Sequence, residues 1–202
     1  MMKKCIAVLL CLMVLSGTAL AELGWSEMSQ YKKGLGVDYN QFFQIYSVLW
    51  EGTTQGTSRL SGKTDLGGGF REYVISMNNA DDLYLLVKND ELYACRVPFG
   101  GSSSGSVDDA YNHGEIMGNV LGCAVISWDM IRSGELRQSF LQEITKKVAE
   151  LQQAVSGWGN LGMYEIGSKS VSGDGYYLTM SARLSYFTYE IEMIFAKNKV
   201  TY

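Results

Sequence analysis

A serine at the centre of G-S-S-S-G, residues 101–105, matches the G-x-S-x-G pattern that positions the nucleophile of many serine hydrolases. Such a serine needs a histidine base and an acid that orients the histidine. The chain has a single histidine, His113, only ten residues after Ser103, whereas in the hydrolase order the histidine comes last, after a distant acid. A connector rich in Gly and Ser also produces this pattern by composition. The sequence therefore favours a loop over a nucleophile at Ser103.

The stretch DDAYNHGE brings together four side chains of types that bind metals: Asp108, Asp109, His113 and Glu115. On a helix, Asp109 and His113 are four residues apart and face the same way. They supply two ligands, whereas a metal site needs three or four. We therefore expect an acidic helix start, which favours the helix dipole, and we assign no metal or other cofactor.

Two further patterns contain residue types that could carry chemistry. Glu190 and Glu192 share one face of a predicted strand, and a pair of carboxylates can hydrolyse glycosides. Two acids on one strand face more often form a solvated surface, so we expect them to point outward. The stretch DLGGGF, residues 65–70, lacks both glycine patterns of nucleotide-binding loops and predicts a turn.

The most suggestive feature is the aromatic content, because all thirteen Tyr and all four Trp lie after residue 21. Rings with polar tips suit binding surfaces, although Tyr is also an ordinary strand former. If the C-terminal sheet has an open face, its alternation places Tyr177, Arg183 and Tyr186 there together with Thr179 and Ser181. We predict Tyr177, Arg183 and Tyr186 as binding residues for a protein or glycan ligand.

Residues 1–21 have the three parts of a secretory signal peptide. Lys3 and Lys4 precede an apolar core, and Ala19-Leu20-Ala21 forms a cleavage signal. We predict cleavage after Ala21, export to the periplasm or the medium, and no membrane insertion afterwards. Residues 22–202 are then expected to form a single domain.

Charge and cysteine content narrow the function further. The net charge is −4 at pH 7, and loss of Lys3 and Lys4 makes the mature chain more acidic, which disfavours nucleic acid as a partner. Cys95 and Cys123 remain after cleavage, and an oxidising compartment favours a disulfide between them. The alternative is two buried thiols that do not meet.

The hydrophobic pattern predicts helices and strands in alternating blocks. Residues 22–37 form a lead-in, Asp38 caps a helix through residue 50, and strands follow up to Pro98. A helix is predicted from residue 106, with Gly114, Gly118 and Gly122 as a bare stripe that another backbone could approach. The rival interpretation is a strand over residues 119–128. A further amphipathic helix is predicted over residues 135–155, before three strands that end near residue 197. The last strand alternates cleanly, which predicts one covered face and one wet face.

This order predicts an α+β fold with antiparallel sheets, built as hairpins, packed against three helices. It leaves open two loosely related α+β halves, residues 38–98 and 106–202. In the first hairpin, a two-residue turn at Asn89-Asp90 places Tyr84, Tyr93 and Cys95 on one face. A Cys95–Cys123 bridge would require the helix that carries Cys123 to cover that face.

These patterns favour an exported, non-catalytic binding or interaction module. Two alternatives stay open: a small secreted hydrolase that uses carboxylates or Ser103, and a structural or assembly protein of the cell envelope.

Overall fold

The computed structural model describes residues 24–102, 107–140, 142–143, 146, 165–173, 175–184 and 188–201. The predicted signal peptide and Ser103 lie outside these residues. The elements, in chain order, are η1 (Met28–Gln30), α2 (Tyr39–Thr54), β1 (Ser58–Gly67), β2 (Phe70–Met77), β3 (Leu83–Lys88), β4 (Glu91–Ser102), α3 (Val107–Ile131), β5 (Glu165–Gly173), β6 (Tyr176–Leu184) and β7 (Thr188–Ala196).

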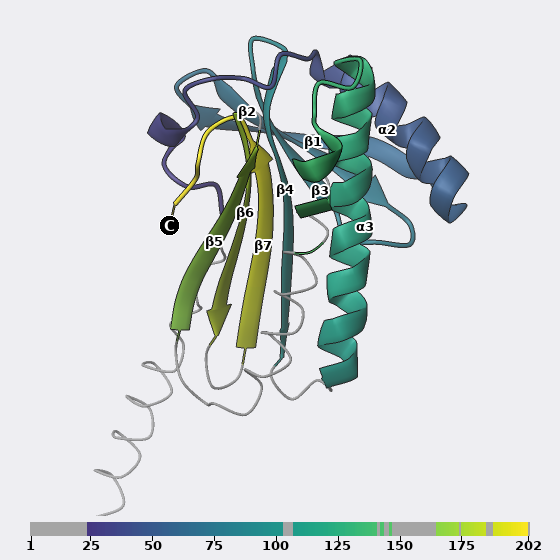
Figure 1. Cartoon of the computed structure of the whole chain (residues 1–202), viewed down its shortest axis with the longest axis vertical. Coiled ribbons are helices and arrows are strands. Elements are labelled where there is room, and N and C mark those ends of the chain that lie inside the picture. The colour runs from purple at the N-terminus through teal and green to yellow at the C-terminus, as the bar shows by residue number, and fades with distance from the viewer. Residues whose placement is uncertain are drawn as a thin grey trace, which may run out of the picture.

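The seven strands form one sheet in the order β1-β2-β3-β4-β7-β6-β5, and every neighbouring pair is antiparallel. The prediction of an α+β fold is confirmed. The β4–β7 pair joins strands from the two ends of the chain, because Cys95 lies opposite Phe195. Figure 1 shows α2 and α3 on one side of this sheet, with β5, β6 and β7 side by side.

Helix α2 begins where the sequence predicts. The Asp38 carboxylate accepts hydrogen bonds from the backbone N–H groups of Asn40 and Gln41, both 2.9 Å long, and so satisfies two donors of the first turn. Its buried side chains recur every four residues and form one apolar stripe against the sheet: Phe42, Tyr46 and Trp50.

The β3–β4 hairpin has the predicted turn but a different register. Asn89 and Asp90 have φ angles of 53° and 62°, as a type I′ turn requires, and Lys88 lies opposite Glu91. The register then shifts, because Val87 pairs with Leu92 whereas Leu86 pairs with Ala94. This places an extra residue, Tyr93, in β4 as a bulge.

Because of the bulge, the predicted assignment of Cys95 to the Tyr84/Tyr93 face of the hairpin is wrong. Beyond the bulge, Cys95 lies opposite Leu85, on the face that packs against the helices, whereas Tyr93 and Leu86 pack on the opposite face. The helix that carries Cys123 therefore covers the Cys95 face and not the Tyr84/Tyr93 face. A bulge of one residue has this effect because strand side chains alternate with a period of two.

Helix α3 runs without interruption through Ile131, so the rival strand over residues 119–128 is wrong. The predicted close approach of a backbone to the glycine stripe is also wrong at Gly122. A Cβ atom placed there would meet nothing within 4 Å among the described residues. Further along the chain, residues 138–140, 142–143 and 146 are helical, and the rest of the predicted helix 135–155 lies outside the described residues.

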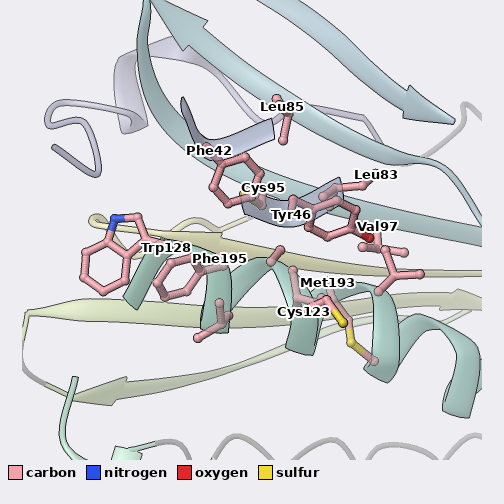
Figure 2. Packing of buried hydrophobic residues seen from close by; sticks show 14 of the residues in the cluster. Phe42, Tyr46, Leu83, Leu85, Cys95, Val97, Cys123, Trp128, Met193 and Phe195 are labelled. Atoms are coloured by element: carbon pink, nitrogen blue, oxygen red, sulfur yellow. The ribbon is translucent and has the colours of Figure 1, made fainter. Parts of the chain in front are cut away.

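The main core lies between the sheet and the two helices (Figure 2). Trp128 of α3 packs edge-on against Phe195 of β7, with ring centroids 5.7 Å apart, and its indole N–H donates to the Leu35 carbonyl at 2.8 Å. Tyr46 of α2 lies in the same cluster, near Cys95 and Cys123. One residue, Trp128, thus links α3, the sheet and the segment before α2.

The opposite face of the sheet, called the second face below, is also covered. A smaller apolar cluster lies there: Tyr31, Phe70, Leu86, Ala94, Ile194, Ala196 and Val200. Tyr31 and Val200 belong to the two ends of the described chain. Figure 1 shows the N-terminal segment and the C-terminal end together on the side of the sheet away from α3. The predicted wet face of β7 is therefore wrong, and Glu192 on that face is 0% exposed.

Candidate functional site

The structure separates the residues considered for catalysis. Glu192 is buried and ion-paired, so it is not the outward-facing acid that the alternation predicts. Asp108, Asp109, His113 and Glu115 lie along α3, but their side chains are outside the described part of the chain. Within that part, no group of three or more His, Cys, Asp or Glu side chains is arranged to hold a metal ion.

Of the three predicted binding residues, Tyr177 falls on the second face. Tyr177 of β6 lies opposite Ala196 and is half-buried. Arg183 lies opposite Glu190 in the same pair of strands, but its side chain is outside the described part of the chain. Tyr186 lies entirely outside the described residues. Between Tyr177 and Arg183 in β6, Thr179 and Ser181 are buried and not open to solvent. The Thr179 hydroxyl donates to the carbonyl of Val200 at 3.4 Å, so the C-terminal segment covers this part of the face.

The predicted disulfide is not formed, since Cys95 and Cys123 are both free and buried. They occupy the same core cluster from facing elements, β4 and α3. Burial raises the pKa of both thiols, and a hydrogen bond between Cys123 and Thr53 partly offsets the shift at Cys123. The thiolate is the reactive form of cysteine, so both side chains serve packing and not nucleophilic chemistry.

A groove of about 380 Å³ lies where the two ends of the described chain meet. We call it the terminal groove, and its lining residues are Ser29, Gln30, Lys32, Asn198 and Lys199.

Two sets of hydrogen bonds hold the walls of the terminal groove together. The Gln30 side chain donates to the Thr201 carbonyl at 2.9 Å and accepts from the Thr201 N–H at 2.8 Å. The Lys33 N–H donates to the Asn198 side-chain oxygen at 2.9 Å. Along the sequence, Lys32 lies between the two hydrogen-bonded positions of the N-terminal segment, and Lys199 between those of the C-terminal segment. The hydrogen bonds therefore fix the two lysine-bearing backbones relative to each other.

A buried polar cluster on the same face anchors the N-terminal segment. The Arg96 guanidinium is 2.5 Å from Glu192 and 3.7 Å from Glu72. It also lies over two rings, 5.2 Å from the centroid of Trp25 and 4.6 Å from that of Tyr84. We call these five residues the Arg96 cluster. Trp25 donates its indole N–H to Glu72, which fixes the start of the described chain on the sheet.

Tyr31 joins this cluster to the terminal groove. Its hydroxyl accepts a hydrogen bond from the Ser26 hydroxyl at 3.3 Å, and its ring packs edge-on against Trp25. Burial raises the pKa of Tyr31 to about 12, and the nearby Glu192 carboxylate adds to the shift, whereas Ser26 and Arg96 oppose it. The neutral phenol is therefore the form that the folded protein favours.

Alkaline pH should release this contact. Because the folded-state pKa of Tyr31 is raised, its contribution to stability is complete below pH 10 and is lost as the pH rises through about 12. We expect Tyr31→Phe to move the midpoint of alkaline unfolding, followed by circular dichroism, to higher pH. The variant should still unfold at higher pH, because burial also raises the pKa of Tyr46 and its ionisation then destabilises the fold. An equal shift in the control Tyr177→Phe, or no shift in Tyr31→Phe, would contradict this assignment.

A second polar cluster connects the C-terminal segment to the turn that follows α3. The Tyr176 hydroxyl donates to Glu135 at 2.7 Å and accepts from the Lys197 ammonium at 3.0 Å. Arg132 donates to the other Glu135 oxygen at 2.6 Å. The hydrogen bonds from Tyr176 and Arg132 lower the pKa of Glu135, so this carboxylate stays ionised and holds its partners at neutral pH. Lys197 is thereby committed to a structural contact.

The groove residues carry a weak sequence signal that the sequence analysis missed. Lys32-Lys33 and Lys197-Asn198-Lys199 are short basic runs near the two ends of an acidic chain. The sequence predicts only a lead-in over residues 22–37, and no local spacing rule joins positions about 165 residues apart.

Helices in the described part of the chain are too short or too polar to cross a bilayer. Comparisons with protein families, with characterised proteins and with solved structures found no match to this chain.

Proposed function

We propose that the protein is an exported, non-catalytic binding module whose ligand lies in the terminal groove. The groove itself is the observation that supports this function. Its volume of about 380 Å³ is within the usual range for small-ligand sites. Lysine, amide and hydroxyl groups line it, and such groups suit a polar ligand such as a glycan or the backbone of a peptide.

The arrangement of polar groups elsewhere agrees with a binding role. The carboxylates of the two polar clusters are used in structural contacts: Glu72 and Glu192 with Arg96, and Glu135 with Tyr176 and Arg132. The terminal groove differs because its lysines project from exposed positions. A surface that is held by hydrogen bonds and carries uncommitted donors is suited to recognition.

A ligand screen with a blocked groove tests this function. The exported protein should bind a subset of a glycan and peptide array, and Ser29→Trp should remove that binding by filling the groove. Thr64→Trp, on the exposed edge strand β1, is the matched control and should bind as the unaltered protein does. Binding that survives Ser29→Trp would place the ligand elsewhere and overturn the proposal.

Export forms a separate part of the proposal, and it rests on the pattern of residues 1–21. Sequencing of the protein recovered from the exported fraction should find Glu22 at the N-terminus. Retention of the intact chain inside the cell would contradict this part.

A further inference from the structure

The terminal groove gathers positive charge in an acidic protein. Four lysines lie in the two short segments that meet there: Lys32, Lys33, Lys197 and Lys199. The whole chain has a net charge of −4. These lysines from the two ends of the chain therefore form a local positive region in a protein whose net charge is negative. The composition alone does not predict this region.

Opposite charges do not neutralise the lysines that line the groove. Lys32 and Lys199 are both exposed, and among the described residues no carboxylate lies within 4.0 Å of either ammonium group. The lining itself contains no acid. One lining residue contacts a carboxylate outside the groove: the Ser29 hydroxyl donates a hydrogen bond to Glu27 at 3.3 Å.

Hydrogen bonds keep this charge in place. The Gln30–Thr201 and Lys33–Asn198 hydrogen bonds hold the two lysine-bearing segments together. Both lysines therefore line one groove, where a single bound anion could pair with both ammonium groups. The Asn198 oxygen is used by Lys33, which leaves its amide NH₂ as a further donor.

We propose that the terminal groove binds an anionic group, a phosphate, sulfate or carboxylate, through Lys32 and Lys199. This inference rests on the proposed binding function and specifies the chemical class of its ligand. The lysines supply positive charge, and the Asn198 amide NH₂ can donate a directional hydrogen bond to the anion. The ligand therefore carries at least one oxyanion, on a free small molecule or on an acidic glycan.

Titration of the full exported protein tests this inference. Inorganic phosphate, citrate and a sulfated oligosaccharide should each produce saturable NMR shifts at the backbone amides of Lys32 and Lys199, weaker at higher ionic strength. The double variant K32Q/K199Q should weaken the affinity about tenfold, as expected for the loss of two exposed ion pairs. Glu27→Gln should strengthen binding, because it removes the carboxylate that Ser29 contacts.

The matched control removes two exposed lysines elsewhere. K63Q/K146Q changes the net charge equally and should leave the affinity within a factor of two of the unaltered protein. If the sulfated oligosaccharide binds and small anions do not, the ligand is an acidic glycan; the reverse result identifies a small molecule. Shifts that K63Q/K146Q weakens as much as K32Q/K199Q, or no saturable shifts at all, overturn the inference.

The proposed function and this inference fail in different ways. A neutral glycan or peptide that Ser29→Trp excludes, and that K32Q/K199Q still binds normally, keeps the binding function and overturns the anionic ligand. If Ser29→Trp changes no binding of any kind, both are overturned.

Discussion

Arg96→Met is expected to lower the free energy of unfolding by about 3–5 kcal/mol, because it removes one partner of a buried ion pair. Glu192 is 0% exposed, and its Oε1 atom lies 2.5 Å from Arg96. The substitution leaves that carboxylate in the protein interior without the guanidinium. It also removes the cation that lies over the rings of Trp25 and Tyr84.

The double variant Arg96→Met with Glu192→Leu distinguishes an ion pair from simple packing. Replacing both charges with apolar groups should cost much less than the sum of the single changes, because the fully buried Glu192 carboxylate is removed together with its partner, while Glu72 keeps the Trp25 N–H as a donor. Urea unfolding followed by circular dichroism gives the three free energies. The exposed Arg71→Met of β2 is the control and should change stability by less than about 0.5 kcal/mol. Additive losses would contradict the assigned ion pair.

Trp128→Ala should lower the free energy of unfolding by about 3–5 kcal/mol, since it opens a cavity in the main core. Trp128 is fully buried and contacts Tyr176 and Phe195, with ring centroids 4.5 and 5.7 Å away. The substitution also leaves the Leu35 carbonyl without the indole donor, which adds to the loss of stability.

Two comparison variants identify the source of that loss. Trp128→Phe keeps a ring but not the N–H, so it should cost clearly less than Trp128→Ala. Val48→Ala, on the exposed side of α2, should change stability by less than about 0.5 kcal/mol. A loss below about 1 kcal/mol in Trp128→Ala would show that α3 does not depend on this contact.

Local chemistry explains the parts of the fold that the sequence predicts well. The Asp38 cap and the Asn89-Asp90 turn depend only on neighbouring residues, so their residue types predict both. The α+β class and the last three strands follow from hydrophobic periodicity in the same way. The glycine content of α3 made a strand plausible, but burial of the helix against the sheet outweighs the weak intrinsic preference.

Long-range contacts explain the parts that could not be predicted. The bulge at Tyr93 reverses the face of Cys95, and no alternation rule locates an extra residue within an apolar strand. The alternation of β7 suggests a wet face, but Glu192 is buried because Arg96, 96 residues away in sequence, pairs with it. An ion pair of this kind makes a polar residue compatible with the interior, which a hydrophobic pattern cannot represent.

The candidate site is harder to predict than the fold for the same reason. The sequence predicts Tyr177, Arg183 and Tyr186 as binding residues only if one face of the C-terminal sheet is open. The face carries the terminal segments instead, and the exposed polar groups are on those segments. Lys32 and Lys199 come together through side-chain hydrogen bonds across most of the chain and through the packing of their neighbours Tyr31 and Val200 on the second face.

The central claim, that the terminal groove is a binding site for an anionic ligand, can be tested most directly by crystallography. Crystals of the protein soaked in selenate would reveal bound anions through the anomalous scattering of selenium. The strongest anomalous peak is expected within hydrogen-bonding distance of both Lys32 and Lys199, and it should be absent in K32Q/K199Q crystals. Peaks only at other exposed lysines, such as Lys63, would contradict the claim.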